Sequence, residues 1–279
     1  MPAGARFVPI ARWANHCVIP PEGFATMTRS RFRNIMLGMA VLPLALGLAA
    51  CGKKDAEGEA PTADQPIARI APPAGKAWVD MIEKTAEGGY RMGNPDAPIK
   101  LIEFAALSCS HCAEFSKESA AKLRDDYVAS GRVSYELRYF MLNAYDVPAS
   151  VLATCGATEA VIPLSEQFWA WQPQMFQNVQ AAGEATLQQI SALPKEQQIA
   201  AIADAAGMTE FFASRGIARD QGKACLADTA KAKALADQTE KAGTEYNVTG
   251  TPTFIINGSS VGSMSWAELE AKLQQAGAR

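Results

Sequence analysis

The sequence predicts an α/β fold in which a small set of strands is interrupted by a long helical insertion. An apolar strand at 99–104 leads into a helix that begins at the C-x-x-C sequence of residues 109–112. Residues 148–246 are helical in pattern throughout, and the chain then returns to a strand at 253–256. Parallel strands need a crossover connection, and this helical block supplies a very long one.

Periodicity and turn residues predict the elements before the insertion. Residues 76–82 have helical spacing and predict a short docking helix, whereas 89–93 predict a first edge strand that ends at an Asn-Pro turn. The helix after the cysteine pair runs to about Ala129, and Gly131 closes it. Residues 133–140 then alternate well enough to form the next strand.

The insertion and the C-terminal elements follow from the same signals. Breaks in the helical pattern fall near Pro163, Gly183, Pro194, Gly207 and Gly216. After the strand at 253–256, an Asn-Gly turn predicts a hairpin completed by 259–262. A capping sequence at 265–268 predicts a final helix that ends at about Gln275.

Composition excludes some classes of partner. The chain has 279 residues, 48% hydrophobic and 20% charged, with a net charge of −3, which is ample for a sizeable core. Lys and Arg are interspersed with Asp and Glu after the N-terminal third. This pattern predicts no nucleic-acid partner.

The N-terminal residues have the features of an export signal. Residues 27–34 are positively charged, and 35–47 are apolar but too short to span a bilayer comfortably. They lead into Leu-Ala-Ala-Cys at 48–51, which resembles the lipobox of bacterial lipoproteins. The alternative is an ordinary secretory signal followed by a chance cysteine. We expect 1–50 to be a signal peptide, with 1–26 interpreted as an over-extended gene start.

On the lipoprotein interpretation the mature chain begins at Cys51, which carries several acyl chains. Several chains hold a protein firmly on a membrane, whereas a single one binds only marginally. Residues 51–75 are rich in Ala, Pro, Glu, Asp and Lys and predict a flexible tether. Export places the protein where thiols are oxidised, which favours disulfide exchange over zinc binding at a C-x-x-C.

The cysteine pair carries the chemistry. Cys109 lies at a helix N-terminus, where exposed N–H groups and the helix dipole favour a thiolate, and Cys112 lies one turn along within bonding distance. Half of a zinc site has the same spacing, so the motif alone leaves both interpretations open. His111 lies between the cysteines, where an imidazole would stabilise the Cys109 thiolate; the alternative is an exposed polar loop residue.

Together these features resemble the DsbA family of thiol–disulfide oxidoreductases, over about residues 90–275. The specific parts are Glu-Phe at 103–104 ahead of the cysteine pair, the helical insertion, and Val-Thr-Gly-Thr-Pro-Thr-Phe at 248–254. One departure is Ser110, where many members have proline, so the redox potential is not carried over.

The resemblance implies a thioredoxin-like fold with a large inserted helical domain. We expect residues 76–147 and 247–279 to form the thioredoxin-like domain and 148–246 the insertion. It also implies a bridge between Cys155 and Cys225, because some relatives carry a second disulfide there. The alternative is a pair of buried free thiols.

The same resemblance implies roles for further residues. Glu103 would lie under the active site and handle protons for the buried thiol, unless it is an outward-facing strand residue. Pro252 would be a cis-proline facing the active-site disulfide, with the backbone of Thr251 pairing with an extended substrate. The alternative is an ordinary edge-strand proline.

The sequence therefore predicts an exported, lipid-anchored thiol–disulfide oxidoreductase of the bacterial cell envelope, facing the periplasm. It would oxidise substrate thiols through a Cys109–Cys112 disulfide and a mixed disulfide, and a membrane redox partner would recycle it. No metal or organic cofactor is implied. One alternative is a disulfide reductase or isomerase. Another is a copper- or zinc-binding lipoprotein that uses Cys109, His111 and Cys112 as ligands.

Overall fold

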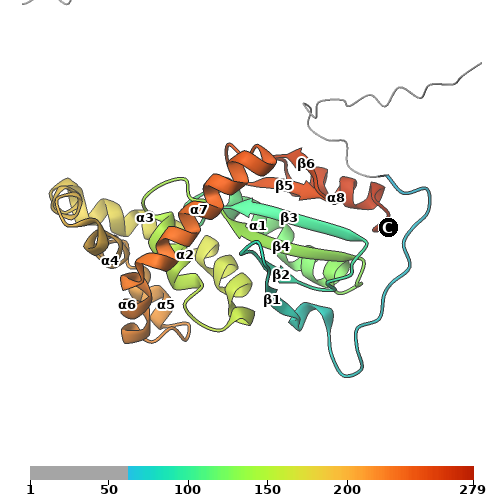
Figure 1. The fold of residues 1–279 in the computed structure, drawn as a ribbon, viewed down its shortest axis with the longest axis horizontal. Coiled ribbons are helices and arrows are strands. Elements are labelled where there is room, and N and C mark those ends of the chain that lie inside the picture. The colour runs from blue at the N-terminus through green and yellow to red at the C-terminus, as the bar shows by residue number, and fades with distance from the viewer. Residues whose placement is uncertain (1–61) are drawn as a thin grey trace, which may run out of the picture. The chain divides into compact units, whose positions relative to one another are not determined.

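The computed structural model describes residues 62–279 (Figure 1). The predicted signal peptide at 1–50 and the lipid attachment at Cys51 lie outside the described residues. Within the described part of the chain, no helix is both long enough and apolar enough to cross a membrane.

A six-stranded sheet with the order β1-β2-β4-β3-β5-β6 forms the centre of the fold. Its central strands β3 and β4 are parallel, and every other neighbouring pair is antiparallel. The strands are β1 (Ile82–Lys84), β2 (Tyr90–Met92), β3 (Ile99–Ala105), β4 (Val133–Tyr139), β5 (Thr253–Ile256) and β6 (Ser259–Gly262). The predicted strands all form, within a residue or two at each end. The strand expected at the edge, β2, is however paired on both sides, because the unpredicted β1 takes the edge position.

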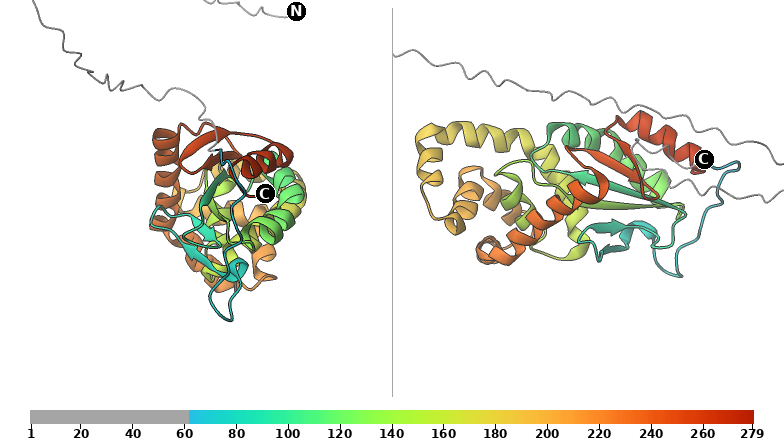
Figure 2. Two further views of the ribbon diagram at one scale, coloured as in Figure 1. Left: turned by 90° about the vertical axis from the view of Figure 1, so that its right-hand side faces the viewer. Right: turned by 45° about the horizontal axis from the view of Figure 1, so that its top comes forward.

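Helices cover both faces of this sheet (Figure 1, Figure 2). Helices α1 (Ser110–Lys122) and α8 (Trp266–Gln275) lie on one face, where the Phe115 ring packs 4.6 Å from that of Phe254. Helix α7 (Thr229–Tyr246) covers the other face, where Tyr246 packs 5.4 Å from Phe104. The predicted capping box starts α8: the Ser265 side chain accepts from the backbone of Glu268.

The insertion is helical throughout and gathers at one end of the sheet (Figure 2). Its remaining helices are α2 (Asp146–Ala153), the 3-10 turn η3 (Thr158–Ala160), α3 (Val161–Ser191), α4 (Lys195–Ala205), α5 (Met208–Ala213) and α6 (Arg219–Ala227). Gly183 kinks α3 at a φ of 78°, and Gly207 separates α4 from α5 at a φ of 74°. Pro163 lies in the first turn of α3, where a missing N–H is tolerated, so the helix continues through it.

A disulfide joins Cys155, just after α2, to Cys225 in α6. It closes a loop with a sequence separation of 70 residues. In the chain-entropy model, a loop of this length stabilises the folded state by about 4 kcal/mol.

Two elements differ from the prediction. The docking helix expected at 76–82 is a single 3-10 turn, Trp78–Asp80, because the chain then pairs as β1 with β2. The helix after the cysteine pair ends as α-helix at Lys122 and continues as a wider π turn, Leu123–Val128.

Residues 62–75 do not fit the expected flexible tether. The backbone N–H groups of Ala63 and Ile67 donate to the carbonyls of Gln275 and Gly277, at 2.9 and 2.8 Å. Farther along, the N–H of Ile70 donates to the Ser130 carbonyl at 2.9 Å. Backbone groups fix this segment to the domain, which is why its polar, proline-containing composition gave no sign of the docking.

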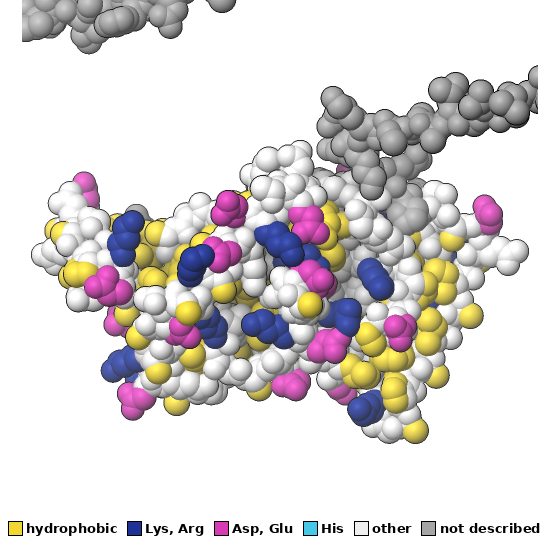
Figure 3. All heavy atoms as spheres, viewed as in Figure 1, with side chains coloured by type: hydrophobic (Ala, Val, Ile, Leu, Met, Phe, Trp, Pro, Cys, Tyr) yellow, Lys and Arg dark blue, Asp and Glu magenta, His cyan; other side chains and the backbone are white. Residues whose placement is uncertain are grey.

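The face of the molecule in Figure 3 carries Lys and Arg side chains interspersed with Asp and Glu. Among residues 62–279, Arg138 is paired with Glu136 at 2.7 Å, and Lys233 with Asp237 at 2.6 Å. The charge pattern on this face is therefore mixed, in agreement with the interspersed charges of the sequence.

Candidate active site

The cysteine pair lies where β3 ends and α1 begins. Cys109 is the N-cap residue of α1, with extended backbone angles, and its Sγ accepts a hydrogen bond from the Cys112 N–H at 3.1 Å. Here the sulfur takes the place of the oxygen that usually caps a helix. Both cysteines are free thiols in this structure, with Cys109 7% exposed and Cys112 0% exposed.

The loop before β5 meets the cysteine pair from the other side. The Thr251–Pro252 peptide bond is cis, and the Cys109 thiol donates to the Thr251 carbonyl at 3.3 Å. The two segments lie 142 residues apart in sequence. The structure thus brings together Cys109, Cys112, Thr251 and Pro252.

The two thiols have opposite electrostatic environments. A hydrogen bond from the Cys112 thiol, opposed by burial, lowers the pKa of Cys109 to about 6. The Thr251 side chain and the backbone N–H groups of Cys112 and His111 lower it further. Burial raises the pKa of Cys112 far above its usual range, and its hydrogen bond to Cys109 adds to this. At neutral pH Cys109 is therefore the thiolate of the pair, and Cys112 stays protonated.

Glu103 is buried beneath the pair. Side chains alternate along β3, so Glu103 lies on the same sheet face as Leu101, toward α1, while Phe104 faces α7. It is 1% exposed, and the Tyr135 hydroxyl donates to its Oε2 at 2.7 Å. Burial raises the pKa of Glu103 to about 8; Tyr135 opposes this, and the charges of Cys109 and Glu166 add to it. The alternative of an outward-facing strand residue is therefore wrong.

His111 is exposed on the first turn of α1. Within residues 62–279 its imidazole makes no hydrogen bond, whereas its backbone N–H helps to lower the pKa of Cys109. The contacts that stabilise the thiolate thus come from the Cys112 thiol, the Thr251 side chain and the backbone. A role for the imidazole stays a prediction.

Sequence reasoning missed a buried acid that holds the loop before Cys109. The Asp146 side chain, 0% exposed, accepts hydrogen bonds from the Ser108 N–H at 2.8 Å and the Ser108 hydroxyl at 3.0 Å. It also accepts from the N–H groups of Leu142 and Asn143. Asp146 opens α2, so the start of the insertion is joined directly to the active-site loop.

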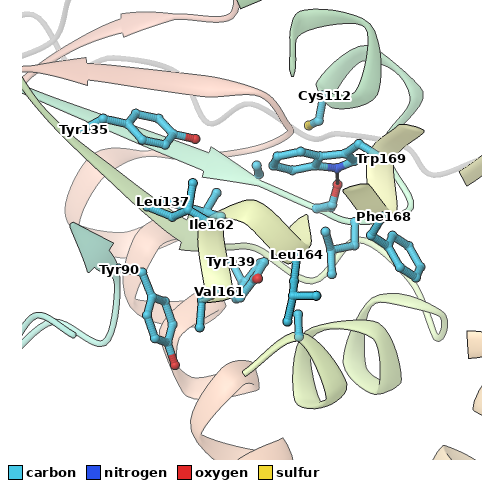
Figure 4. Packing of buried hydrophobic residues seen from close by; sticks show 14 of the residues in the cluster. Tyr90, Cys112, Tyr135, Leu137, Tyr139, Val161, Ile162, Leu164, Phe168 and Trp169 are labelled. Carbon is cyan, nitrogen blue, oxygen red and sulfur yellow. Dashed lines mark hydrogen bonds between the residues drawn. The ribbon is translucent and has the colours of Figure 1, made fainter. Parts of the chain in front are cut away.

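Helix α3 supplies two further contacts to the same loop. The Trp169 indole N–H donates to the Ala106 carbonyl at 3.0 Å. The Gln172 amide donates to the carbonyls of Leu107, at 2.7 Å, and Cys109, at 3.0 Å. Figure 4 shows the Trp169 ring beside the Cys112 side chain. No local signal could have found these residues, because they lie more than 60 positions from their partners.

The other predicted site residues lie apart from the pair or outside the described chain. Cys155 and Cys225 are bonded to each other within the insertion. Cys51 lies outside the described residues. Among residues 62–279, no group of three or more His, Cys, Asp or Glu side chains is arranged to hold a metal ion.

The sequence model of the thioredoxin family matches residues 85–275. A solved structure named as a protein-disulfide isomerase from Novosphingobium aromaticivorans is 31% identical, with a TM-score of 0.64, covering 68% of this chain and 97% of that one. The chain belongs to the DsbA family of thioredoxin-fold proteins. The thioredoxin-like fold with its helical insertion is confirmed.

More distant members of the family show the same fold or similar sequences. Wolbachia pipientis α-DsbA1 is 19% identical over 68% of this chain and 91% of its own, with a TM-score of 0.53, a likeness of fold alone. A chain named as a protein-disulfide oxidoreductase in Rickettsia bellii is 22% identical over 193 residues. That match covers 69% of this chain and 66% of the relative, so this chain spans slightly less than two thirds of the relative's length.

Proposed function

We propose that the protein is an exported thiol–disulfide oxidoreductase that oxidises the thiols of other proteins. The observation that carries the proposal is the asymmetry of the cysteine pair. Cys109 has a pKa of about 6, so its thiolate is stable at neutral pH and is a good leaving group. Cys112 is buried, and its pKa is raised. Stabilisation of the Cys109 thiolate favours the reduced pair, so the oxidised pair readily passes its disulfide to a client.

The reaction proceeds in two exchanges. A substrate thiolate attacks Sγ of Cys109 in the enzyme disulfide, which forms a mixed disulfide and releases Cys112 as a thiolate that takes up a proton. A second substrate thiolate then attacks the substrate sulfur of the mixed disulfide, and Cys109 leaves as a thiolate. The substrate loses two electrons and gains a disulfide, while the enzyme pair gains the two electrons.

The backbone around the cis-proline would hold the client. The Thr251 carbonyl lies 3.3 Å from Sγ of Cys109, so an extended peptide that pairs with this backbone would bring its own cysteine to the reactive sulfur. Protein thiols outside the cytoplasm are the proposed substrates. A membrane redox partner would reoxidise the pair.

The direction of exchange is tested by equilibrating the pair with glutathione. An oxidant is expected to have a reduction potential less negative than about −200 mV, in the range between isomerases and strong oxidants. A potential near about −270 mV, the value for thioredoxin, would reverse the proposed direction.

One observation keeps an isomerase as the second candidate. The solved structure that is 31% identical to this chain is named as a protein-disulfide isomerase. Refolding of a scrambled disulfide protein in a glutathione buffer separates the two activities. An isomerase rescues scrambled bonds, whereas an oxidant acts mainly on the reduced substrate.

The proposed lipid anchor at Cys51 has its own test. Mass spectrometry of the protein extracted from bacterial membranes is expected to give an N-terminal peptide that starts at Cys51 and carries acyl chains. A soluble protein cleaved at another position would overturn the anchor and leave the redox proposal standing.

A further inference from the structure

A narrow crevice leads from the surface to the buried acid beneath the cysteine pair. It lies between α1, α3 and the sheet, and its polar lining consists of Glu103, Ser116, Ser119, Tyr135 and Glu166. It has free space of ≈ 10 Å³, which is room for about one water molecule. The rest of the lining is apolar or aromatic: Met92, Phe115, Ala120, Leu123 and Trp169. The crevice is therefore a narrow gap of mixed lining in which one water molecule could bridge the polar groups.

Glu103 lies at the buried end of this crevice, and one of its two carboxyl oxygens has no hydrogen-bond partner among the described residues. Its Oε2 accepts from Tyr135, but among the described residues its buried Oε1 has no hydrogen-bond partner. Leaving a buried carboxyl oxygen unpaired costs about 1–3 kcal/mol, and such a group needs an explanation. Because Glu103 lines the crevice, its carboxyl group is placed to exchange a proton with a water molecule there.

Glu166 lines the same crevice from the other side. It belongs to α3 in the insertion and is partly exposed, so it is in contact with both solvent and the crevice. Burial raises the pKa of Glu166; Arg124 opposes this and Asp125 adds to it. Arg124 is itself paired with Asp125 at 2.9 Å, which leaves Glu166 without a dedicated ion-pair partner among the described residues.

The reaction needs such a route because Cys112 has no exposed surface. Each turnover delivers one proton to the Cys112 sulfur when the enzyme is reduced and removes one when it is reoxidised. The groups that face Glu103 are Tyr135, Cys109, Cys112 and, across the crevice, Glu166. Of these, Glu166 is the carboxylate with access to water.

We propose that Glu166 is the solvent-side station of a proton path that runs through the crevice to Glu103 and on to Cys112. This inference rests on the proposed function. When Cys112 leaves as a thiolate, the Glu103 carboxyl gives it a proton and becomes a carboxylate. A proton from Glu166, carried across the crevice, restores the acid, and Glu166 is reprotonated from bulk water. Reoxidation runs the same transfers backward. Glu166 acts through Glu103 and is a positioning residue.

The test measures the two half-reactions of the purified protein by stopped-flow tryptophan fluorescence, from pH 4 to 9. Oxidised enzyme is mixed with dithiothreitol, and reduced enzyme with oxidised glutathione. The variants are E166Q, E166D and E118Q. Glu118 is an exposed acid on α1 that does not line the crevice, so E118Q is the matched control for the loss of one negative charge.

In E166Q both half-reactions are expected to slow by roughly tenfold. This is less than the rate enhancement of about 10²–10⁴-fold that a positioned general acid or base contributes. The pH profile should change shape, and the rate ratio between H₂O and D₂O should rise. E166D should keep most of the rate, and E118Q should match the wild type. The alkylation rate of Cys109 and the thermal midpoint should stay unchanged in every variant.

Several results would overturn the inference. Wild-type rates and pH profile in E166Q would remove Glu166 from the path. A parallel loss of Cys109 alkylation or of thermal stability would show that Glu166 has only a structural role. If the wild-type protein itself fails to exchange disulfides with either reagent, the proposed function fails, which is a distinct outcome.

Discussion

Replacing Cys112 with Ala should raise the pKa of Cys109, because the Cys112 thiol is the largest contributor to its lowering. A hydrogen bond to a charged group is worth about 1.5–3 kcal/mol, and each pKa unit corresponds to about 1.4 kcal/mol. Losing the donor should therefore raise the pKa from about 6 by roughly 1–2 units. The backbone N–H groups of Cys112 and His111 remain, so the pKa should stay below that of a free thiol.

The consequence at neutral pH is large. With a pKa of about 6, the reduced wild-type protein holds about ten Cys109 thiolates for every thiol at pH 7. In C112A the two forms should be present at about parity or with the thiol in excess. The assay is thiolate absorbance against pH, checked by the pH dependence of iodoacetamide alkylation.

The matched control is C112S, which keeps a hydroxyl donor at the same position. Its Cys109 should titrate near the wild-type value. If C112A also titrates near pH 6, the helix N-terminus and the backbone set the pKa without the second thiol, and the reasoning is refuted. Equal shifts in C112A and C112S would assign the effect to packing.

Three further predictions concern stability and the neighbouring histidine. C155A/C225A should lose about 4 kcal/mol, or roughly 8–16 °C in thermal midpoint by calorimetry, with thiol exchange retained; an unchanged midpoint would contradict the loop-closure estimate. The pKa of Glu103 rises from 4.5 to about 8 on folding, so the folded state keeps a proton that the unfolded state releases. Stability should therefore fall as the pH rises between these values, and E103Q should be more stable than the wild type by a few kcal/mol at pH 8 but not at pH 4 in urea denaturation. H111A should raise the Cys109 pKa less than C112A does. An equal or larger shift would show that the imidazole stabilises the Cys109 thiolate.

Sequence reasoning succeeded where the signal is local. The strand before the cysteines, the strand at 253–256 and the capping box of α8 each depend on a short run of residues, and each forms as expected. The cysteine pair of the candidate active site could be located for the same reason. A C-x-x-C motif carries its helix-cap geometry within four residues.

It failed where the contact is long-range. Asp146, Trp169 and Gln172 hold the active-site loop, yet each looks like an ordinary helix residue, since its partner lies 38 to 65 positions away. The crevice between α1 and α3 likewise requires the three-dimensional packing of both helices. The role of the His111 imidazole, which rests on its position between the cysteines, stays a prediction, because its side chain is exposed.

The docked segment 62–75 sets how far the protein can reach. It meets the domain at Ser130, just before β4, at the edge where the parallel strands β3 and β4 begin (Figure 1). Cys109 follows the opposite end of β3, whose seven residues span about 23 Å. With a lipid at Cys51, only ten residues, 52–61, separate the anchor from residue 62.

The eleven Cα–Cα steps from residue 51 to residue 62 extend to at most about 40 Å, against roughly 85 Å had the segment been free to residue 75. Docking of residues 62–75 thus halves the maximum length of the free chain between Cys51 and the domain. It also fixes the point at which this chain leaves the domain. A membrane-bound protein of this kind would keep residue 62 within about 40 Å of the bilayer. A redox partner embedded in the same membrane would therefore meet the domain within that distance of the bilayer.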